Sequence, residues 1–416
     1  MSSLWRNREF NLLWAGQTLS ELGDTVALLA LPLLVLTFTG SPVQAGLVGT
    51  IALVTRLLCR LPIGVLVDQV DRRRAMIVCD VVRLAAFVGL GVAVVAGWMN
   101  LAVIIVVAIV DAACGSLFGT AEHAALRSIV PTTQLPEAVA RNEARSYGAS
   151  LVGPPLGGLL FGLGHALPFF GNAVSYLGSL VGVALIRKPL QSDRQETPAR
   201  YGVELAEGVK FVFRDPFRRA LLAISAPLNL AFNGAIFAII LTLQRHGTPP
   251  AVIGLTETII GVGGLLGAFA APALQRWLRL TVLVRTICWA ATGLIALSAL
   301  FTASVAAAVP VAVALFLSPA CNAALFSYQS AITPDRLQGR VVSVIFLVAN
   351  SAAAAAPMLA GVFVATWGGP AAILCFAAAA SISAIAATVG RGIREMRPLT
   401  EAEAEAEAEA APAPVA

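Results

Sequence analysis

The sequence predicts an all-α integral membrane protein with twelve transmembrane helices arranged as two pseudo-symmetric six-helix bundles. Of its 416 residues, 58% are hydrophobic and only 12% are charged, about half the charged share of a soluble domain. The apolar residues gather in runs of about 20, which is the length that crosses a bilayer as a helix. One long polar connection divides these runs into two sets of six. Composition therefore excludes a soluble domain, and it excludes disorder except in the tail.

Glycine, proline and arginine clusters separate the apolar runs and so mark the ends of each predicted helix. The six spans expected before the polar connection are 11–38, 42–67, 75–96, 101–120, 139–162 and 167–186. The six expected after it are 217–243, 252–274, 280–301, 305–327, 340–364 and 370–389.

Four segments follow from these spans. We expect an N-terminal bundle over residues 1–187, a linker over 188–216, a C-terminal bundle over 217–392 and a disordered Glu/Ala tail over 393–416. An offset of 203 residues brings Gly-Pro positions of the fifth span onto Pro357 and Gly361 of the eleventh, which indicates a duplicated six-helix unit.

The distribution of arginine in the loops predicts the orientation of the chain. Loops on one side carry most of the basic residues, and Arg245 is the only strongly basic residue on the other side. Basic loops face the cytoplasm. We therefore expect a multi-pass protein of the cell membrane with both termini in the cytoplasm.

Several kinds of chemistry are excluded by residue usage. The chain has two lysines, Lys188 and Lys210, and neither lies in a Walker A loop, so no ATP site is expected. The three histidines and six cysteines are scattered without metal-ligand spacing, which predicts no metal site and no cofactor. The net charge of +5 is spread along the loops, so nucleic acid is not an expected partner. No arrangement typical of an enzyme is found.

Charged residues inside the apolar runs are the strongest functional signal. Glu21 and Asp24 share one face of the first span, and Arg56 and Arg60 share one face of the second. An unpaired charge at the bilayer centre costs roughly 2.5–3.5 kcal/mol. Depth along the two antiparallel helices predicts that Glu21 meets Arg60 and that Asp24 meets Arg56. Structural ion pairs remain an equal alternative to a proton-coupling or substrate site.

Further polar residues lie in other spans. Asp111 and Glu257 are isolated acids, and each is a candidate proton carrier because burial disfavours a charged carboxylate. Asn229 and Asn233 are candidates for lining a polar cavity, or for hydrogen bonding between helices. Asp80 and Arg83, which are three residues apart, are interpreted as a structural pair.

Two motifs carry a family resemblance. Gly64-Val-Leu-Val-Asp68, followed by Arg72 and Arg73, resembles the Gly-x-x-x-Asp-Arg-x-Gly-Arg-Arg loop of the major facilitator superfamily, with Gln69 and Asp71 departing from it. In the fifth span, four further positions resemble the core of that family's antiporter motif, while Ala140 and Ala149 replace its upstream glycines. These four positions are Gly153, Pro154, Gly157 and Gly158.

The resemblance implies the major facilitator fold and a branch similar to macrolide-efflux proteins and the enterobactin exporter. It implies a conformational latch at Gly64, Asp68, Arg72 and Arg73, and export of an amphipathic small molecule by proton antiport. The residues expected to carry the coupling are Asp24 or Asp111, with Arg56 modulating the acid. The expected partners are a small-molecule substrate, protons and the lipid bilayer. A siderophore or other narrow-substrate exporter, a nutrient symporter and a non-transporting membrane sensor are the alternatives.

Overall fold

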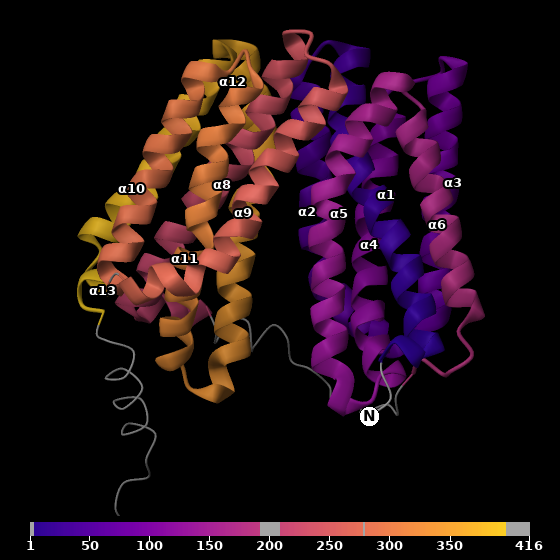
Figure 1. Cartoon of the computed structure of the whole chain (residues 1–416), viewed down its shortest axis with the longest axis horizontal. Coiled ribbons are helices and arrows are strands. Elements are labelled where there is room, and N and C mark those ends of the chain that lie inside the picture. Colours follow the sequence, from indigo (N-terminus) through magenta and orange to yellow (C-terminus); the bar gives the residue numbers. More distant parts are fainter. Residues whose placement is uncertain (1–3, 192–208, 278, 397–416) are drawn as a thin grey trace, which may run out of the picture. The chain divides into compact units, whose positions relative to one another are not determined.

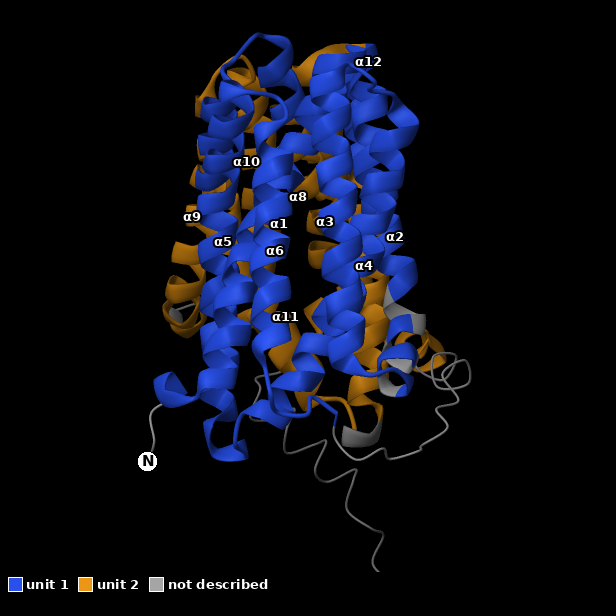
Figure 2. Ribbon diagram, turned by 90° about the vertical axis from the view of Figure 1, so that its right-hand side faces the viewer, with its two compact units in different colours: residues 1–196, 240–258, 357–366 blue, residues 197–239, 259–356, 367–416 orange. Residues whose placement is uncertain are grey.

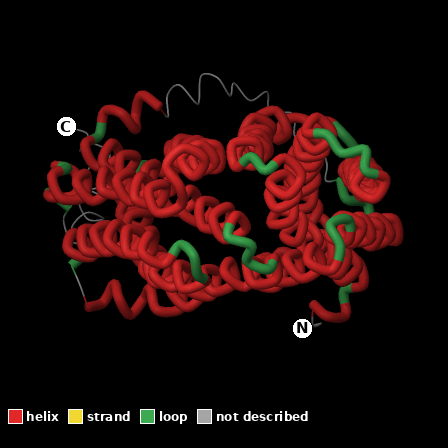
Figure 3. Tube along the Cα trace, turned by 90° about the horizontal axis from the view of Figure 1, so that it is seen from above, coloured by secondary structure: helices red, strands yellow, loops and turns green. Residues whose placement is uncertain are grey.

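A computed structural model describes residues 4–191, 209–277 and 279–396, without the side chains at positions 60–62, 64, 65, 68, 277, 335 and 336. Within these ranges the chain is made of helices and loops, and no strand is present (Figure 3). The greater part of the predicted linker and almost all of the predicted tail lie outside the described residues.

The first half of the chain forms six long helices (Figure 1). They are α1 (Arg8–Thr39), α2 (Pro42–Gln69), α3 (Arg72–Ala96), α4 (Leu101–Ile129), α5 (Leu135–Leu163) and α6 (Leu167–Leu185). Helix α4 continues nine residues beyond its predicted end, and α5 begins four residues before its predicted start. These two extensions carry charged residues, which is why apolar runs alone did not include them.

The second half begins with α8 (Pro216–Arg245) and ends with the short α13 (Arg391–Arg394). Between them lie α9 (Pro250–Trp277), α10 (Leu280–Ser298), α11 (Ala308–Ala331) and α12 (Asp335–Val389). Gly368 interrupts α12 with a backbone φ of 81°, a conformation that glycine adopts without steric penalty. Helix α12 therefore consists of two helices, as the predicted spans 340–364 and 370–389 require.

Ten helices of the described chain are long and apolar enough to cross a membrane. Counting the two parts of α12 separately and adding α5 brings the number to twelve. The apolar content of α5 is lower because its first turns carry Glu137, Arg141 and Arg145. Large apolar side chains on the helix surfaces, such as Phe269 at 78% exposure, suit a lipid environment. The all-α membrane fold is confirmed.

Polar residues at the helix ends explain where the helices begin. The side chains of Asn7, Ser41, Asp71 and Asn100 accept hydrogen bonds from the first turns of α1, α2, α3 and α4. Such caps satisfy backbone N–H groups that have no partner within the helix.

The chain divides into two compact units (Figure 2). Unit 1 contains residues 1–196, 240–258 and 357–366, and unit 2 contains residues 197–239, 259–356 and 367–416. In unit 1, α1 packs against α5 and α6, α3 packs against α4 and α6, and α2 packs against α4. This packing brings polar residues of α1, α3, α4, α5 and α6 together inside the unit.

Candidate functional site

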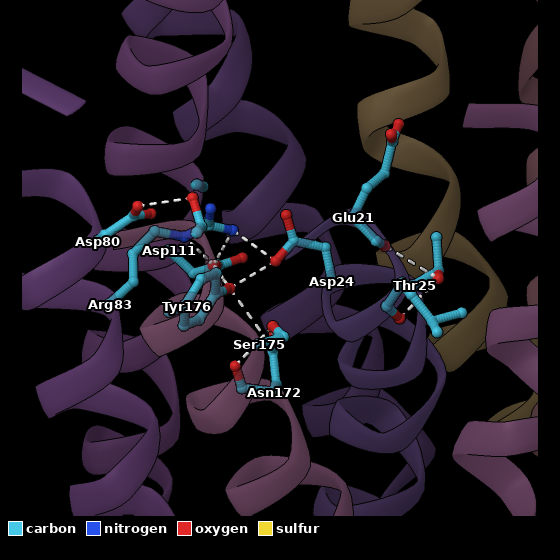
Figure 4. Close-up of polar contacts among 12 residues, drawn as sticks. Glu21, Asp24, Thr25, Asp80, Arg83, Asp111, Asn172, Ser175 and Tyr176 are labelled. Carbon is cyan, nitrogen blue, oxygen red and sulfur yellow. Dashed lines mark hydrogen bonds and ion pairs between the residues drawn. The ribbon is translucent and has the colours of Figure 1, made fainter. Parts of the chain in front are cut away.

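A buried arginine on α3 holds two carboxylates from neighbouring helices (Figure 4). The Arg83 side chain is 3% exposed. Its Nη2 donates to Asp24 Oδ1 on α1 at 2.6 Å and to Asp111 Oδ1 on α4 at 2.7 Å, and its Nε donates to the same Asp111 oxygen at 2.9 Å. Hydrogen bonds between ionised partners are short and strong, so this Asp24–Arg83–Asp111 cluster ties three helices together.

A tyrosine on α6 completes the cluster. The Tyr176 hydroxyl contacts Asp24 Oδ1 at 2.5 Å and Asp111 Oδ1 at 3.0 Å, and Asn172 donates to the Tyr176 oxygen at 3.1 Å. The Arg83 guanidinium lies 4.2 Å from the centre of the Tyr176 ring, where the ring attracts a cation. Tyr176 therefore orients the guanidinium as well as the two acids.

The predicted pairing of Asp24 with Arg56 is wrong. Asp24 binds Arg83, and Arg56 lies 3.7 Å from Asp111, with its own side chain 45% exposed. Interpreting Asp80 and Arg83 as a simple structural pair also missed the role of Arg83, because the guanidinium reaches across to α1 and α4. The side chain of Arg60 lies outside the described residues.

A second cluster with the same composition surrounds Arg145 of α5. Arg145 donates through Nε to Glu21 at 2.8 Å and through Nη1 to Glu122 of α4 at 2.9 Å. Ser146 also donates to Glu21. The side chains of Arg145 and Glu122 are each 6% exposed. The described partners of Glu21 therefore come from α5, whereas the sequence predicted Arg60.

Sequence reasoning missed Glu122, Arg145 and Tyr176. Glu122 lies in the extension of α4 beyond residue 120, whereas Arg145 lies within the predicted span 139–162 but was not recognised as part of a site. The i,i+3 and i,i+4 neighbours of Glu122 are apolar or small, which is a signal that the helix continues. Tyr176 carried no distinctive signal, because a single tyrosine in an apolar run is common.

The remaining predicted acid, Glu257, lies apart from both clusters. It is on α9 and half-buried, and among the described residues it has no hydrogen bond or ion pair.

The two predicted asparagines line a cavity in unit 2. This cavity of about 300 Å³ lies between α8 and α11. Its polar lining consists of Asn229, Asn233, Asn322, Ser225 and Ser318, and apolar side chains such as Phe232 and Leu325 form the rest. The amide nitrogens of Asn229 and Asn233 donate to carbonyls one turn earlier in α8, which leaves their amide oxygens as acceptors. None of the lining residues is charged.

The predicted latch is described only in part. Arg72 Nη1 donates to the carbonyl of Leu190 at 3.2 Å, and Arg73 Nη2 donates to the carbonyl of Ala184 at 2.5 Å. Arg73 thus binds backbone in the last turn of α6, and Arg72 binds backbone in the segment that follows α6. Gly64 and Asp68 are among the residues whose side-chain positions lie outside the description.

The glycines of the fifth-span motif allow close helix contacts. A Cβ added to Gly153 would lie 1.9 Å from Thr25 Oγ1 of α1, and one added to Gly157 would lie 2.7 Å from the carbonyl oxygen of Val26. A Cβ on Gly158 would lie 2.1 Å from the Pro250 carbonyl oxygen of α9. Reciprocally, a Cβ on Gly254 would lie 2.3 Å from the carbonyl oxygen of Pro154. Only glycine fits at these contacts.

No group of three or more histidine, cysteine or acidic residues within the described ranges is placed to hold a metal ion.

Comparison with known proteins identifies the family. The model of the Major Facilitator Superfamily matches residues 13–357. The chain belongs to this superfamily. This agrees with the fold, with the buried charges within it and with the resemblance carried by the sequence motifs.

Two of the curated relatives are named as efflux proteins. The multidrug efflux pump Tap of Mycobacterium tuberculosis is 30% identical over 287 residues, which are 65% of this chain and 66% of that protein. The chain thus matches just under two thirds of the length of that relative. Macrolide efflux protein A of Streptococcus pyogenes is 26% identical over 267 residues, covering 62% of this chain and 65% of that protein. These relatives and the family indicate a transporter rather than an enzyme.

Solved structures share the fold. The nucleoside transporter NupG has a TM-score of 0.69 at 12% identity, over 94% of this chain and all of that chain. A bacterial homologue of the iron transporter ferroportin has a TM-score of 0.67 at 18% identity, over 97% of this chain and all of that chain. At these identities the similarity concerns the fold alone.

Proposed function

We propose that the protein is a secondary active transporter that exports an amphipathic small molecule in exchange for protons, by alternating access. One observation carries this proposal: a single buried guanidinium, Arg83, binds two carboxylates on different helices. The proposal rests on the chemistry of that cluster, on the uncharged cavity of unit 2 and on the printed names of the relatives.

The Asp24–Arg83–Asp111 cluster is suited to taking up one proton. A guanidinium stays charged at all relevant pH values, so two ionised acids leave the three groups with one net negative charge. Adding one proton neutralises that charge and still leaves one ion pair. Asp24 is 29% exposed, so water has access to it. Proton binding would weaken the tie between α1 and α3, which links protonation to helix movement.

The cavity of unit 2 is suited to an amphipathic substrate. Its volume lies at the lower end of the range for small-molecule sites. Apolar walls favour a hydrophobic body, and the amide and hydroxyl groups of Asn229, Asn233 and Ser318 offer hydrogen bonds. Two relatives are named for multidrug efflux and for macrolide efflux, which supports a small-molecule substrate.

The loop arginines support an orientation for the chain in this proposal. We place both termini in the cytoplasm, with Arg72 and Arg73 at the cytoplasmic end of α3, because basic loops remain on that side. Export then requires an energy source, and neither lysine of the sequence lies in a Walker A loop. The proton gradient supplies it in this proposal.

The test is accumulation of a fluorescent amphipathic cation in cells that express the protein, with and without a protonophore. We expect lower accumulation than in control cells, and we expect the protonophore to abolish the difference. Asp24→Asn and Asp111→Asn should each remove it. Higher accumulation would indicate a symporter. Gradient-driven export that survives in both variants would refute the coupling assignment.

A further inference from the structure

One acid in unit 1 is buried without an ion-pair partner among the described side chains. Asp80 of α3 is fully buried, at 0% exposure. Its Oδ2 accepts a hydrogen bond of 2.7 Å from Ser179 Oγ of α6, and Ser179 Oγ accepts one of 2.8 Å from Gln17 Nε2 of α1. Within the described part of the chain, the other oxygen of Asp80, Oδ1, has no hydrogen-bond partner.

This environment fits a neutral carboxylic acid. An ionised carboxylate that is removed from water without a paired cation becomes neutral by binding a proton. The cation beside Asp80 is Arg83, but its Nε and Nη2 are directed at Asp24 and Asp111. Asp80 therefore receives one neutral hydrogen bond, whereas each of the other two acids receives charged ones.

Asp80 is also placed to serve as an alternative partner for Arg83. The two residues are three apart on α3 and so share a face of the helix, and Figure 4 shows their side chains next to one another. Arg83 is 3% exposed and permanently charged, so Asp80 can replace Asp24 as its second anionic partner beside Asp111. Asp111 has a second cation available, because Arg56 lies 3.7 Å from it.

We propose that Asp80 is the buried member of a proton relay with Asp24, in which Arg83 moves to whichever of the two acids is ionised. The O–H bond of Asp80 breaks, its proton binds the Asp24 carboxylate, and Arg83 leaves Asp24 for the new Asp80 carboxylate. The total charge is unchanged and no further reactant is needed. Asp24 then exchanges its proton with water. The relay rests on the proposed proton antiport and adds Asp80 as a residue of that site.

The ionisable groups around Asp80 come from four helices. Arg83 and Cys79 are on its own helix, Asp24 is on α1, Asp111 and Cys114 are on α4, and Tyr176 is on α6. Arg83 is the only cation in this set. Arg56 lies outside the set and contacts Asp111 at 3.7 Å. A change in the position of Arg83 is therefore the event that decides whether Asp80 is ionised.

Infrared difference spectroscopy on the full-length protein in lipid vesicles tests the relay, because protonated carboxylic acids absorb separately from carboxylates. We expect a carboxylic acid band at neutral pH that disappears in Asp80→Asn. The band should also disappear in Asp24→Asn, because the neutral amide releases Arg83 to Asp80. Asp215→Asn in unit 2 is the matched control and should leave the band unchanged.

Ser179→Ala provides a second variant in case Asp80→Asn does not fold. It removes the hydrogen bond to Asp80, so it should shift the band without abolishing it. A wild-type spectrum without an Asp80 band would overturn the proposal, and so would a band that persists in Asp24→Asn.

The infrared measurement does not depend on transport. If the infrared bands behave as expected but export does not depend on the proton gradient, the proposed function fails. The charge state assigned to Asp80 then still stands. If export is proton-driven and Asp80→Asn shows wild-type export with a wild-type pH profile, the relay fails alone.

Discussion

Replacing Arg83 by glutamine should destabilise the protein strongly, because it leaves two buried acids without their cation. Arg83 makes three hydrogen bonds of 2.6–2.9 Å to Asp24 and Asp111. Removing one partner of a buried ion pair costs about 3–5 kcal/mol. Both acid side chains are less than one third exposed, so solvent screening reduces this cost only in part. We expect a loss of about 3–5 kcal/mol in the free energy of unfolding.

The loss should depend on pH and on the second acid. It should be larger at high pH, where both acids of the variant are ionised, and smaller at low pH, where protons neutralise them. Combining Arg83→Gln with Asp111→Asn should recover part of the lost stability, since one uncompensated charge is removed. Unfolding by denaturant in mixed micelles, followed by tryptophan fluorescence, measures both effects.

Arg141→Gln is the matched control. Arg141 forms an ion pair with Glu137 at 2.6 Å and lies over the Trp5 ring, but Glu137 is 51% exposed. An exposed pair with a cation–π contact contributes no more than about 1–2 kcal/mol. If Arg83→Gln costs no more than Arg141→Gln at high pH, Arg83 does not neutralise the two acids and the reasoning is refuted.

Three further predictions concern other parts of the molecule. Gly158→Ala should lower stability by about 1–3 kcal/mol through overpacking against α9, whereas Gly162→Ala, whose Cβ would have its nearest contact at 4.0 Å, should not; equal thermal midpoints would contradict this. Glu122→Gln should cost roughly 1–3 kcal/mol because a buried partner of an arginine is lost, and Glu137→Gln less than about 1 kcal/mol, as measured by denaturant unfolding. Asn233→Leu should raise cellular accumulation of substrates with hydrogen-bonding groups more than that of purely apolar ones; an equal effect on both would argue against substrate binding in the cavity.

The helical fold followed directly from the sequence because hydropathy reports burial in lipid. Runs of about 20 apolar residues have few alternatives to a membrane helix. The same argument failed at the charged ends of α4 and α5. Glu122, beyond the predicted end of α4, is paired with Arg145 of α5, so α4 continues where hydropathy alone predicts a loop.

The candidate site was predicted in some of its residues but not in its pairs. Asp24 and Asp111 were recognisable because an acid in an apolar run needs a special environment. Their shared partner Arg83 depends on the rotation of α3 about its axis and on its packing against α4 and α6. Neither property is encoded in the residue spacing of one helix, so depth alone selected Arg56 instead.

The measurement that tests the central claim most directly uses purified protein in vesicles with a trapped pH indicator. A substrate gradient is imposed without any pH gradient, and proton movement is recorded as the substrate crosses the membrane. The account predicts proton movement opposite to the substrate in the wild-type protein and none in Asp24→Asn. Substrate movement without proton movement, or protons moving in the same direction as the substrate, would contradict it.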